Sequence, residues 1–171
     1  FAGKLTARKK PDVLLSAWKQ ANWYDHQRPA LVFVGDGDLK QSLMSEVEQI
    51  SNRRDVYFTG FRNQTELPAI YKAADVFVLS SEKEPWGLAI NEAMACGTAV
   101  IASDQCGAVF DLVDDETGVV VKAGDAADLA AALSKALERS DEMGQAAKRR
   151  ISNWDFEADV AGLKAALEYV L

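Results

Sequence analysis

The chain has 171 residues, of which 49% are hydrophobic and 26% charged, and its formal net charge is −7. This composition is typical of one globular domain and excludes a disordered chain. No apolar run approaches the roughly 20 residues of a membrane span, so we expect a soluble protein. The acidic balance argues against a nucleic-acid partner, although four of the first ten residues are basic.

Two further observations bear on the cellular setting and on completeness. Cys96 and Cys106 lack the C-x-x-C spacing of a zinc or redox site, and His26, the one histidine, is interpreted as an ordinary surface residue. A reducing, cytoplasmic location is therefore expected. The chain starts at Phe1 without a leader segment or an initiator Met, so we expect a fragment of a longer protein.

Short β-rich runs alternate with helical stretches along residues 1–139, which predicts an α/β fold with a parallel sheet between helices. Six strands are predicted, at Phe1–Leu5, Ala30–Val34, Val56–Thr59, Asp75–Leu79, Ala99–Ala102 and Gly118–Val121. The helices predicted between them are Pro11–Tyr24, Asp38–Ser51, Gln64–Ala73, Gly87–Cys96, Gly107–Val113 and Ala126–Arg139. Residues 140–171 form a helical tail (Asp141–Ser152 and Asp155–Val170) that packs on the sheet or reaches toward a neighbouring domain. We expect a single domain over residues 1–171.

Parallel sheets of this kind bind ligands outside the carboxyl ends of their strands, so the loops at that edge are the candidate sites. The first such loop contains GDGD at residues 35–38. Lys40 replaces the third glycine of a dinucleotide fingerprint, which weakens that interpretation. Asp36 and Asp38 resemble a metal-binding pair but are better explained as caps of the following helix.

The basic loop at the beginning of the chain offers cations to a phosphate. Lys9 together with Lys4 could neutralise a diphosphate, whereas the plainer interpretation is a solvated basic loop.

The stretch EPWGLAINE at residues 84–92 is the most informative part of the sequence. Gly87 is expected to begin a helix whose free amides point toward the ligand edge of the sheet. Glu92 falls among small apolar residues that predict near-complete burial, so its carboxylate needs a partner. That partner is either a protein donor, such as Lys9 or a backbone amide, or the two hydroxyls of a ribose.

This stretch resembles the donor-binding, carboxyl-terminal domain of retaining glycosyltransferases of family 4, which have two facing Rossmann-like domains in the GT-B architecture. The resemblance is carried by a glutamate, seven residues and a second glutamate (Glu84 and Glu92), followed by AMACG at residues 93–97. The blocks FAGKLTARKKP, GDGDL and VYFTGFRNQTELPAIYKAADVFVLSS also follow the family order. Lys4 stands where the family usually has Arg, and Lys10 where it usually has Gly. The resemblance implies a three-layer Rossmann-like domain with a six-stranded parallel sheet and extra carboxyl-terminal helices.

The resemblance also implies roles for the phosphate end of the donor. Lys4 and Lys9 would hold the diphosphate of a nucleoside-diphosphate sugar, with help from the amides of Gly87 and Leu88. Fixed cations and a helix terminus would neutralise the leaving diphosphate, so no cofactor and no metal are expected.

For the rest of the donor, the resemblance implies that Glu92 binds the ribose hydroxyls and Glu84 contacts hydroxyls of the sugar. Phe61 and Arg62 would lie against the base. The acceptor site would belong to an amino-terminal domain that is absent from this chain, and any peripheral membrane contact would be made through that domain. The isolated chain would bind donor without transferring sugar. The alternatives are a nucleotide-binding module without catalysis, or a sugar-nucleotide epimerase or phosphorylase on the same scaffold.

Overall fold

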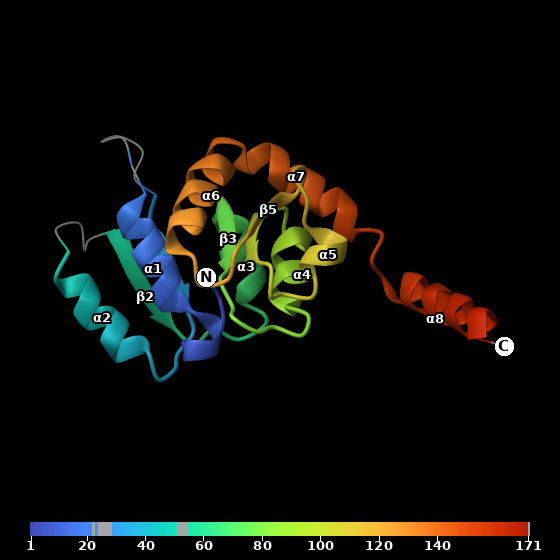
Figure 1. The fold of residues 1–171 in the computed structure, drawn as a ribbon, viewed down its shortest axis with the longest axis horizontal. Helices are drawn as coiled ribbons and strands as arrows, with labels where there is room; N and C mark the ends of the chain where they lie inside the picture. Colours follow the sequence, from blue (N-terminus) through green and yellow to red (C-terminus); the bar gives the residue numbers. More distant parts are fainter. Residues whose placement is uncertain (22, 24–28, 51–54, 171) are drawn as a thin grey trace.

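The computed structural model describes residues 1–21, 23, 29–50 and 55–170. The predicted ends of two helices, Tyr24 and Ser51, and the predicted surface residue His26 therefore lie outside the described residues. Strands and helices alternate along most of the chain (Figure 1). The strands are β1 (Leu31–Val34), β2 (Val56–Gly60), β3 (Val76–Leu79), β4 (Ala99–Ser103) and β5 (Gly118–Val121). The helices are η1 (Ala7–Lys9), α1 (Pro11–Gln20), α2 (Lys40–Glu48), α3 (Leu67–Ala73), α4 (Leu88–Ala95), α5 (Val109–Leu112), α6 (Ala126–Glu138), α7 (Ser140–Ile151) and α8 (Phe156–Val170).

The strands form two parallel sheets, one with the order β1-β2 and one with the order β3-β4-β5. The α/β class and the parallel pairing are confirmed. The prediction of six strands in one sheet was wrong, because the described residues contain five strands in two sheets.

The segment predicted as the first strand, Phe1–Leu5, makes only a single parallel bridge, between Ala2 and Val34. The amide of Gly3 donates to the Val34 carbonyl at 2.9 Å, after which Leu5 turns to donate to the carbonyl of Asp36. A Cβ on Gly35 would come within 2.0 Å of the Gly3 carbonyl oxygen, so the two backbones approach too closely for a side chain there. The apolar pattern therefore identified a segment that lies beside β1 but does not form a regular ladder with it.

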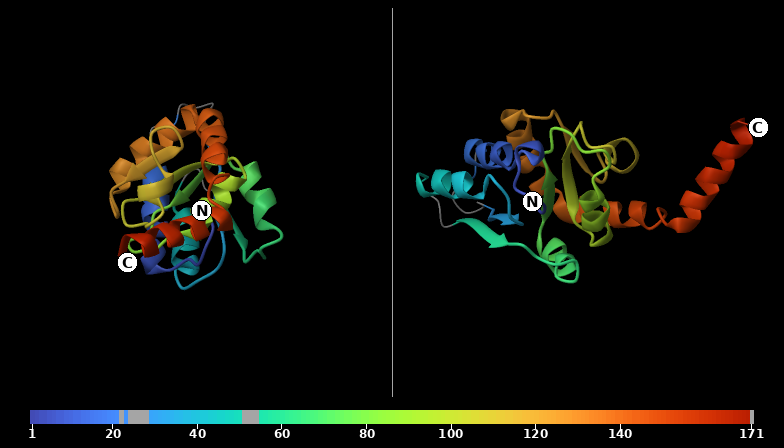
Figure 2. Two further views of the ribbon diagram at one scale, coloured as in Figure 1. Left: turned by 90° about the vertical axis from the view of Figure 1, so that its right-hand side faces the viewer. Right: turned by 90° about the horizontal axis from the view of Figure 1, so that it is seen from below.

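Helices cover both faces of the sheets (Figure 2). One core cluster joins α1, α2 and α6 to the strands and includes Leu14, Phe33 and Ile101. The other joins α3, α4 and α5 to the opposite face and includes Ile90 and Leu112. Side chains of α7 contribute to both clusters. This three-layer arrangement leaves the loops at the carboxyl ends of the strands free to form a site.

The two helices of the tail differ in how they pack. Helix α7 lies against α4 and β4 and buries residues such as Met143 and Ala147. Helix α8 projects away from the layers (Figures 1 and 2), and its apolar side chains are exposed, Phe156 at 88% and Leu163 at 64%. Within the described residues, no helix has both the length and the apolar character needed to cross a membrane.

Candidate functional site

The site is organised around an ion pair that joins two loops distant in sequence. Lys9 ends the short helix η1, and Glu84 lies in the loop after β3. The ammonium of Lys9 contacts Oε2 of Glu84, and the two side chains are only 17% and 13% exposed. The structure thus brings together two of the predicted site residues and shields both charges from solvent.

Further contacts fasten the same two loops to each other. The hydroxyl of Ser80 donates to the carbonyl of Lys10 at 2.8 Å, and the amide of Glu82 donates to the carbonyl of Arg8 at 2.8 Å. The Lys10 ammonium also lies 3.1 Å from Oε2 of Glu82. Lys10 has a φ of 50°, the one positive value at a non-glycine residue in the part of the chain that the structure describes. The resemblance described above implies a glycine at this position, and a left-handed backbone is the conformation that glycine adopts most readily.

The loop that carries Glu84 is held in place by the turn after β4. The amide of Gly107 donates to the Glu84 carbonyl at 3.0 Å, and the amide of Ala108 donates to the Trp86 carbonyl at 2.9 Å. A Cβ on Gly107 would come within 2.1 Å of the carbonyl oxygen of Pro85, so this position accepts only glycine without a shift of backbone. Glu84 is therefore positioned by main-chain contacts on both sides.

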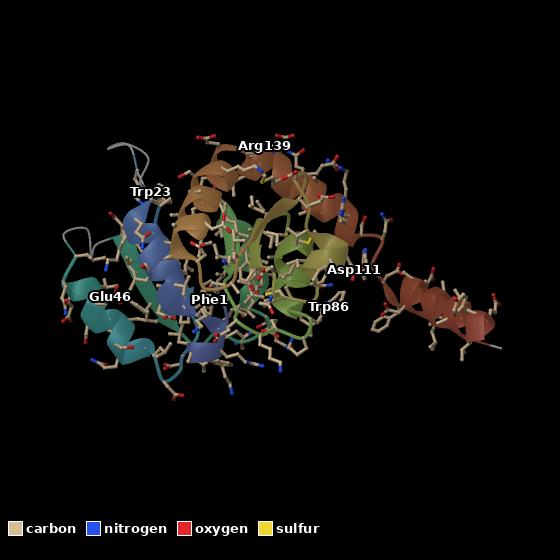
Figure 3. The ribbon with its side chains drawn as sticks, in the orientation of Figure 1. Phe1, Trp23, Glu46, Trp86, Asp111 and Arg139 are labelled. Carbon is tan, nitrogen blue, oxygen red and sulfur yellow. The ribbon has the colours of Figure 1, made fainter. Side chains whose placement is uncertain are left out.

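Trp86 links this loop to the helical tail. Its indole N–H donates to Oδ1 of Asn91 at 2.9 Å, and its ring lies against that of Trp154, with centroids 5.9 Å apart. Trp86 is labelled beside α4 in Figure 3. The contact joins the beginning of α4 to the connection between α7 and α8.

Gly87 ends the loop and caps α4 with a φ of 102°. The amides of Gly87 and Leu88 donate to no acceptor among the described residues, and the Leu88 side chain is 68% exposed. These free amides are the feature of a helix N-terminus that binds anions, and they follow Glu84 by three and four residues.

Glu92 lies in the same helix but not in the setting that the sequence predicted. The apolar composition of α4 predicted near-complete burial, and this was wrong, because Glu92 is exposed. Leu88, Glu92 and Ala95 form an open face, whereas Ile90 and Met94 are turned into the core. Small residues surround Glu92 in sequence, yet the helical repeat places it on the solvent side.

The partner of Glu92 is neither Lys9 nor a backbone amide. Its Oε2 accepts a hydrogen bond of 2.9 Å from the hydroxyl of Tyr71, a buried residue of α3. Burial, followed by the hydrogen bond to Glu92, raises the pKa of Tyr71 far above its usual value. The phenol therefore stays protonated and acts as a donor, which leaves Oε1 of Glu92 without a protein donor among the described residues.

Three other predicted site residues lie apart from these contacts. The Lys4 side chain is exposed and has no hydrogen-bond or ion-pair partner among the described residues. Phe61 is 78% exposed in the loop after β2, and Arg62 pairs with Glu66 at 3.2 Å. The structure brings none of the three into contact with Lys9 or Glu84.

The two aspartates of GDGD do not cap the next helix, so that prediction was wrong. Helix α2 begins two residues after Asp38, and its N-cap position is Leu39, which has no capping side chain. Asp36 accepts from the amide of Gly37 and pairs with Lys40 at 2.6 Å instead. Within the described ranges, no three His, Cys, Asp or Glu side chains gather where they could share a metal ion.

Sequence reasoning missed several contacts near the site, and the one made by Tyr71 is the clearest. Tyr71 lies in another helix, 21 residues from Glu92, and no local pattern in the sequence links the two residues. The ion pair between Lys10 and Glu82 was missed as well, because charged loop residues usually remain solvated. An open groove of about 510 Å³ also borders Glu92, between α4 and the end of α7, with Asn91, Lys148 and Trp154 among its lining residues.

Comparison with known proteins identifies the family of the chain. A family model described as glycosyl transferases group 1 matches residues 1–153. The D-inositol 3-phosphate glycosyltransferase of Corynebacterium aurimucosum is 31% identical over 172 residues, which cover 96% of this chain and 41% of that protein.

Two solved structures share the fold. Sucrose-phosphate synthase from Thermosynechococcus elongatus superimposes with a TM-score of 0.81 at 30% identity, over 99% of this chain and 45% of the other. HepE from Anabaena in complex with UDP gives a TM-score of 0.75 at 24% identity, over 99% of this chain and 47% of the other.

The family model and the shared fold define a carboxyl-terminal type of domain of GT-B glycosyltransferases, with a Rossmann-like α/β core. This chain belongs to the glycosyl transferases group 1 family. It spans less than half the length of the curated relative and of the two solved structures.

Proposed function

We propose that this chain is the donor-binding half of a retaining glycosyltransferase of family 4. The full protein would transfer a sugar from a nucleoside-diphosphate sugar to an acceptor hydroxyl. The observation that carries the proposal is the meeting of Lys9 and Glu84 immediately before the free amides of α4. A cation, helix amides and a carboxylate are the groups that a diphosphate followed by a sugar needs.

The proposed arrangement follows the order of these groups along the site. Lys9 and the amides of Gly87 and Leu88 bind the diphosphate, and Lys4 adds a second cation from the same loop. Glu84 accepts from hydroxyls of the sugar. Stabilisation of the leaving diphosphate by fixed positive charge is the catalytic contribution of this half, and it needs neither a metal nor another cofactor.

The nucleoside would extend along α4 toward the loop after β2. Glu92 is exposed, and its Oε1 is available to accept from the ribose hydroxyls. Phe61 and Arg62 would flank the base, since both are exposed at the carboxyl end of β2.

The acceptor site is assigned to an amino-terminal domain of the same protein, working in the cytoplasm. The exposed apolar side chains of α8 support such a partner domain, because none of the side chains described at residues 156–169 is buried against the domain. The chain alone would then bind donor but not transfer sugar.

Thermal unfolding with added nucleotides tests the proposal. UDP, GDP and ADP, each alone and as a sugar conjugate, are added with and without a chelator. At a ligand concentration of about 100 times Kd, binding stabilises the folded state by about 2.7 kcal/mol, or roughly 5 to 11 °C in Tm for a domain of this size. One base should be preferred, and the chelator should change nothing. No stabilisation by any of the nucleotides would refute the proposal, and stabilisation abolished by the chelator would refute its metal-free part.

A further inference from the structure

The proposed site has an unusual property, which is that its two charged groups already neutralise each other. The ammonium of Lys9 and the carboxylate of Glu84 are in contact and largely shielded from solvent. A diphosphate and a sugar would have to compete with this pair for the same two groups.

The pair is built into the fold rather than formed by two free side chains. Main-chain contacts with the turn after β4 hold Glu84 on both sides, and Lys9 ends a helical turn tied to Ser80 through its carbonyl at 3.2 Å. The loops that carry the two residues are also joined by the bond from the Glu82 amide to the Arg8 carbonyl. These contacts keep the two backbones close together, so that an exchange of partners requires movement of the two side chains only.

This arrangement has opposite consequences for a nucleoside diphosphate and for a complete nucleotide sugar. A diphosphate that takes Lys9 leaves the carboxylate of Glu84 without its cation and beside a second negative charge, which is unfavourable in a shielded site. A nucleotide sugar brings the same phosphates, but its sugar hydroxyls donate to Glu84 and replace the lost ammonium.

We propose that donor binding is an exchange of partners between Lys9 and Glu84, and that this exchange makes the domain favour the complete nucleotide sugar over the nucleoside diphosphate left after transfer. The inference rests on the proposed function. It adds that Glu84 opposes the binding of product, so that the resting ion pair re-forms as product leaves.

The charge-removing variant Glu84→Gln separates this idea from a simpler one. If Glu84 only accepts from the sugar, the variant should bind UDP as the wild type does and bind UDP-glucose more weakly. If binding is an exchange, the variant should bind UDP about five- to tenfold more tightly, a gain of roughly 1 to 1.4 kcal/mol. The preference for UDP-glucose over UDP should fall in the same variant.

A matched control excludes a general effect of charge. Glu82→Gln removes the same charge from the same loop, but Glu82 is 63% exposed and pairs with Lys10 rather than Lys9. It should leave the affinity for UDP within about twofold of the wild type, because exposed pairs are weak and screened.

The experiment is isothermal titration calorimetry of the 171-residue chain with UDP and UDP-glucose, or with the GDP or ADP pair if the wild type prefers another base. Cooperative unfolding in urea confirms that each variant is folded, and Glu84→Ala replaces Glu84→Gln if the latter is not. Unchanged or weaker UDP binding by the folded variant would overturn the exchange, as would equal tightening by Glu82→Gln. Failure of the wild type to bind any of these nucleotides would instead refute the proposed function.

Discussion

The loop at residues 80–87 and helix α4 each carry one glutamate of the motif, and they hold these two carboxylates in opposite ways. Glu84 is enclosed, paired with a cation and fixed by main-chain hydrogen bonds. Glu92 is exposed and has one neutral donor, the hydroxyl of Tyr71. The two glutamates of the motif therefore differ: the carboxylate of Glu84 is shielded and ion-paired, and that of Glu92 is exposed.

The difference follows from local backbone structure. Gly107 lets the turn after β4 approach the loop closely and fix Glu84, whereas the regular repeat of α4 places Glu92 on the exposed face of that helix. Substitutions that act on the loop should therefore change the stability of the chain and its affinity for the diphosphate. Substitutions at Glu92 should change the contribution of the ribose hydroxyls to nucleotide affinity.

The largest effect is expected from a substitution that displaces the loop holding Glu84. Gly107→Ala places a Cβ within 2.1 Å of the Pro85 carbonyl oxygen, so the backbone of the loop must shift. Urea denaturation should show a loss of about 1 to 3 kcal/mol in the free energy of unfolding, the range for an overpacked site. Affinity for the nucleoside diphosphate should also fall, because Glu84 and the amides of α4 move together.

Gly162 in α8 provides the matched control, since a Cβ there would meet nothing within 4 Å. Gly162→Ala should leave stability unchanged or raise it by up to about 1 kcal/mol through helix propensity. Equal effects of the two substitutions would show that the close approach at Gly107 does not hold the loop.

The second prediction concerns removal of the cation from the ion pair between Lys9 and Glu84. Lys9→Ala should weaken binding of the nucleoside diphosphate by about 2 to 3 kcal/mol, as expected for a charged hydrogen bond, and change nucleoside binding little. Calorimetry with UDP and uridine, or the corresponding pair of the preferred base, measures both.

Lys4→Ala removes the same charge from an exposed side chain of the same loop and should cost less. The difference between the two variants should persist in high salt, because the shielded Lys9 is screened less than Lys4. An equal loss for nucleoside and diphosphate would mean that Lys9 shapes the loop rather than binding phosphate.

The third prediction concerns the exposed carboxylate of Glu92. Glu92→Gln should weaken ribonucleotide binding by about 2 kcal/mol, the value for hydrogen bonds to a charged group, and should barely change the stability of the free chain. The 2′-deoxynucleotide should lose affinity relative to the ribonucleotide in the wild type and lose much less in the variant. A large loss of stability, together with equal sensitivity to the deoxy ligand, would place Glu92 in the scaffold instead.

Some features of the fold could be predicted from the sequence, and others, like the contrast between the two glutamates, could not. Alternating β-rich and helical runs predicted the α/β class and five of the strands, because burial patterns of period 2 and 3.6 are local properties. The segment at Phe1–Leu5 has the same pattern but forms one bridge, and its backbone lies so close to Gly35 and Gly37 that neither position has room for a side chain. No local pattern reports such a contact.

The candidate site was predictable in its residues but not in its pairings. The spacing of Glu84 and Glu92 and the glycine turn between them are visible in the sequence. That Lys9 pairs with Glu84 rather than Glu92 depends on a contact across 75 residues, and the burial of Glu92 was overestimated from composition alone. The side chain that does contact Glu92 is that of Tyr71, which lies in another helix 21 residues away.

The smallest expected effect sharpens the comparison by testing that side chain. Tyr71→Phe removes the hydroxyl that donates to Glu92 but keeps the ring, which packs edge-on against Phe77 with centroids 5.4 Å apart. Because the exposed carboxylate of Glu92 can bind water instead, the free energy of unfolding should fall by only about 0.5 to 1 kcal/mol. The freed carboxylate is less well oriented, so ribonucleotide affinity should fall about two- to fivefold, and the loss of affinity for a 2′-deoxynucleotide relative to the ribonucleotide should shrink.

Tyr57→Phe on β2 is the control, because it removes the same atom from a tyrosine that is 51% exposed. It should change neither the free energy of unfolding nor the nucleotide affinities. If Tyr71→Phe lowers stability while the ratio of ribonucleotide to deoxynucleotide affinity stays at the wild-type value, Tyr71 serves the core alone, and Glu92 is oriented by its helix rather than by its hydrogen bond.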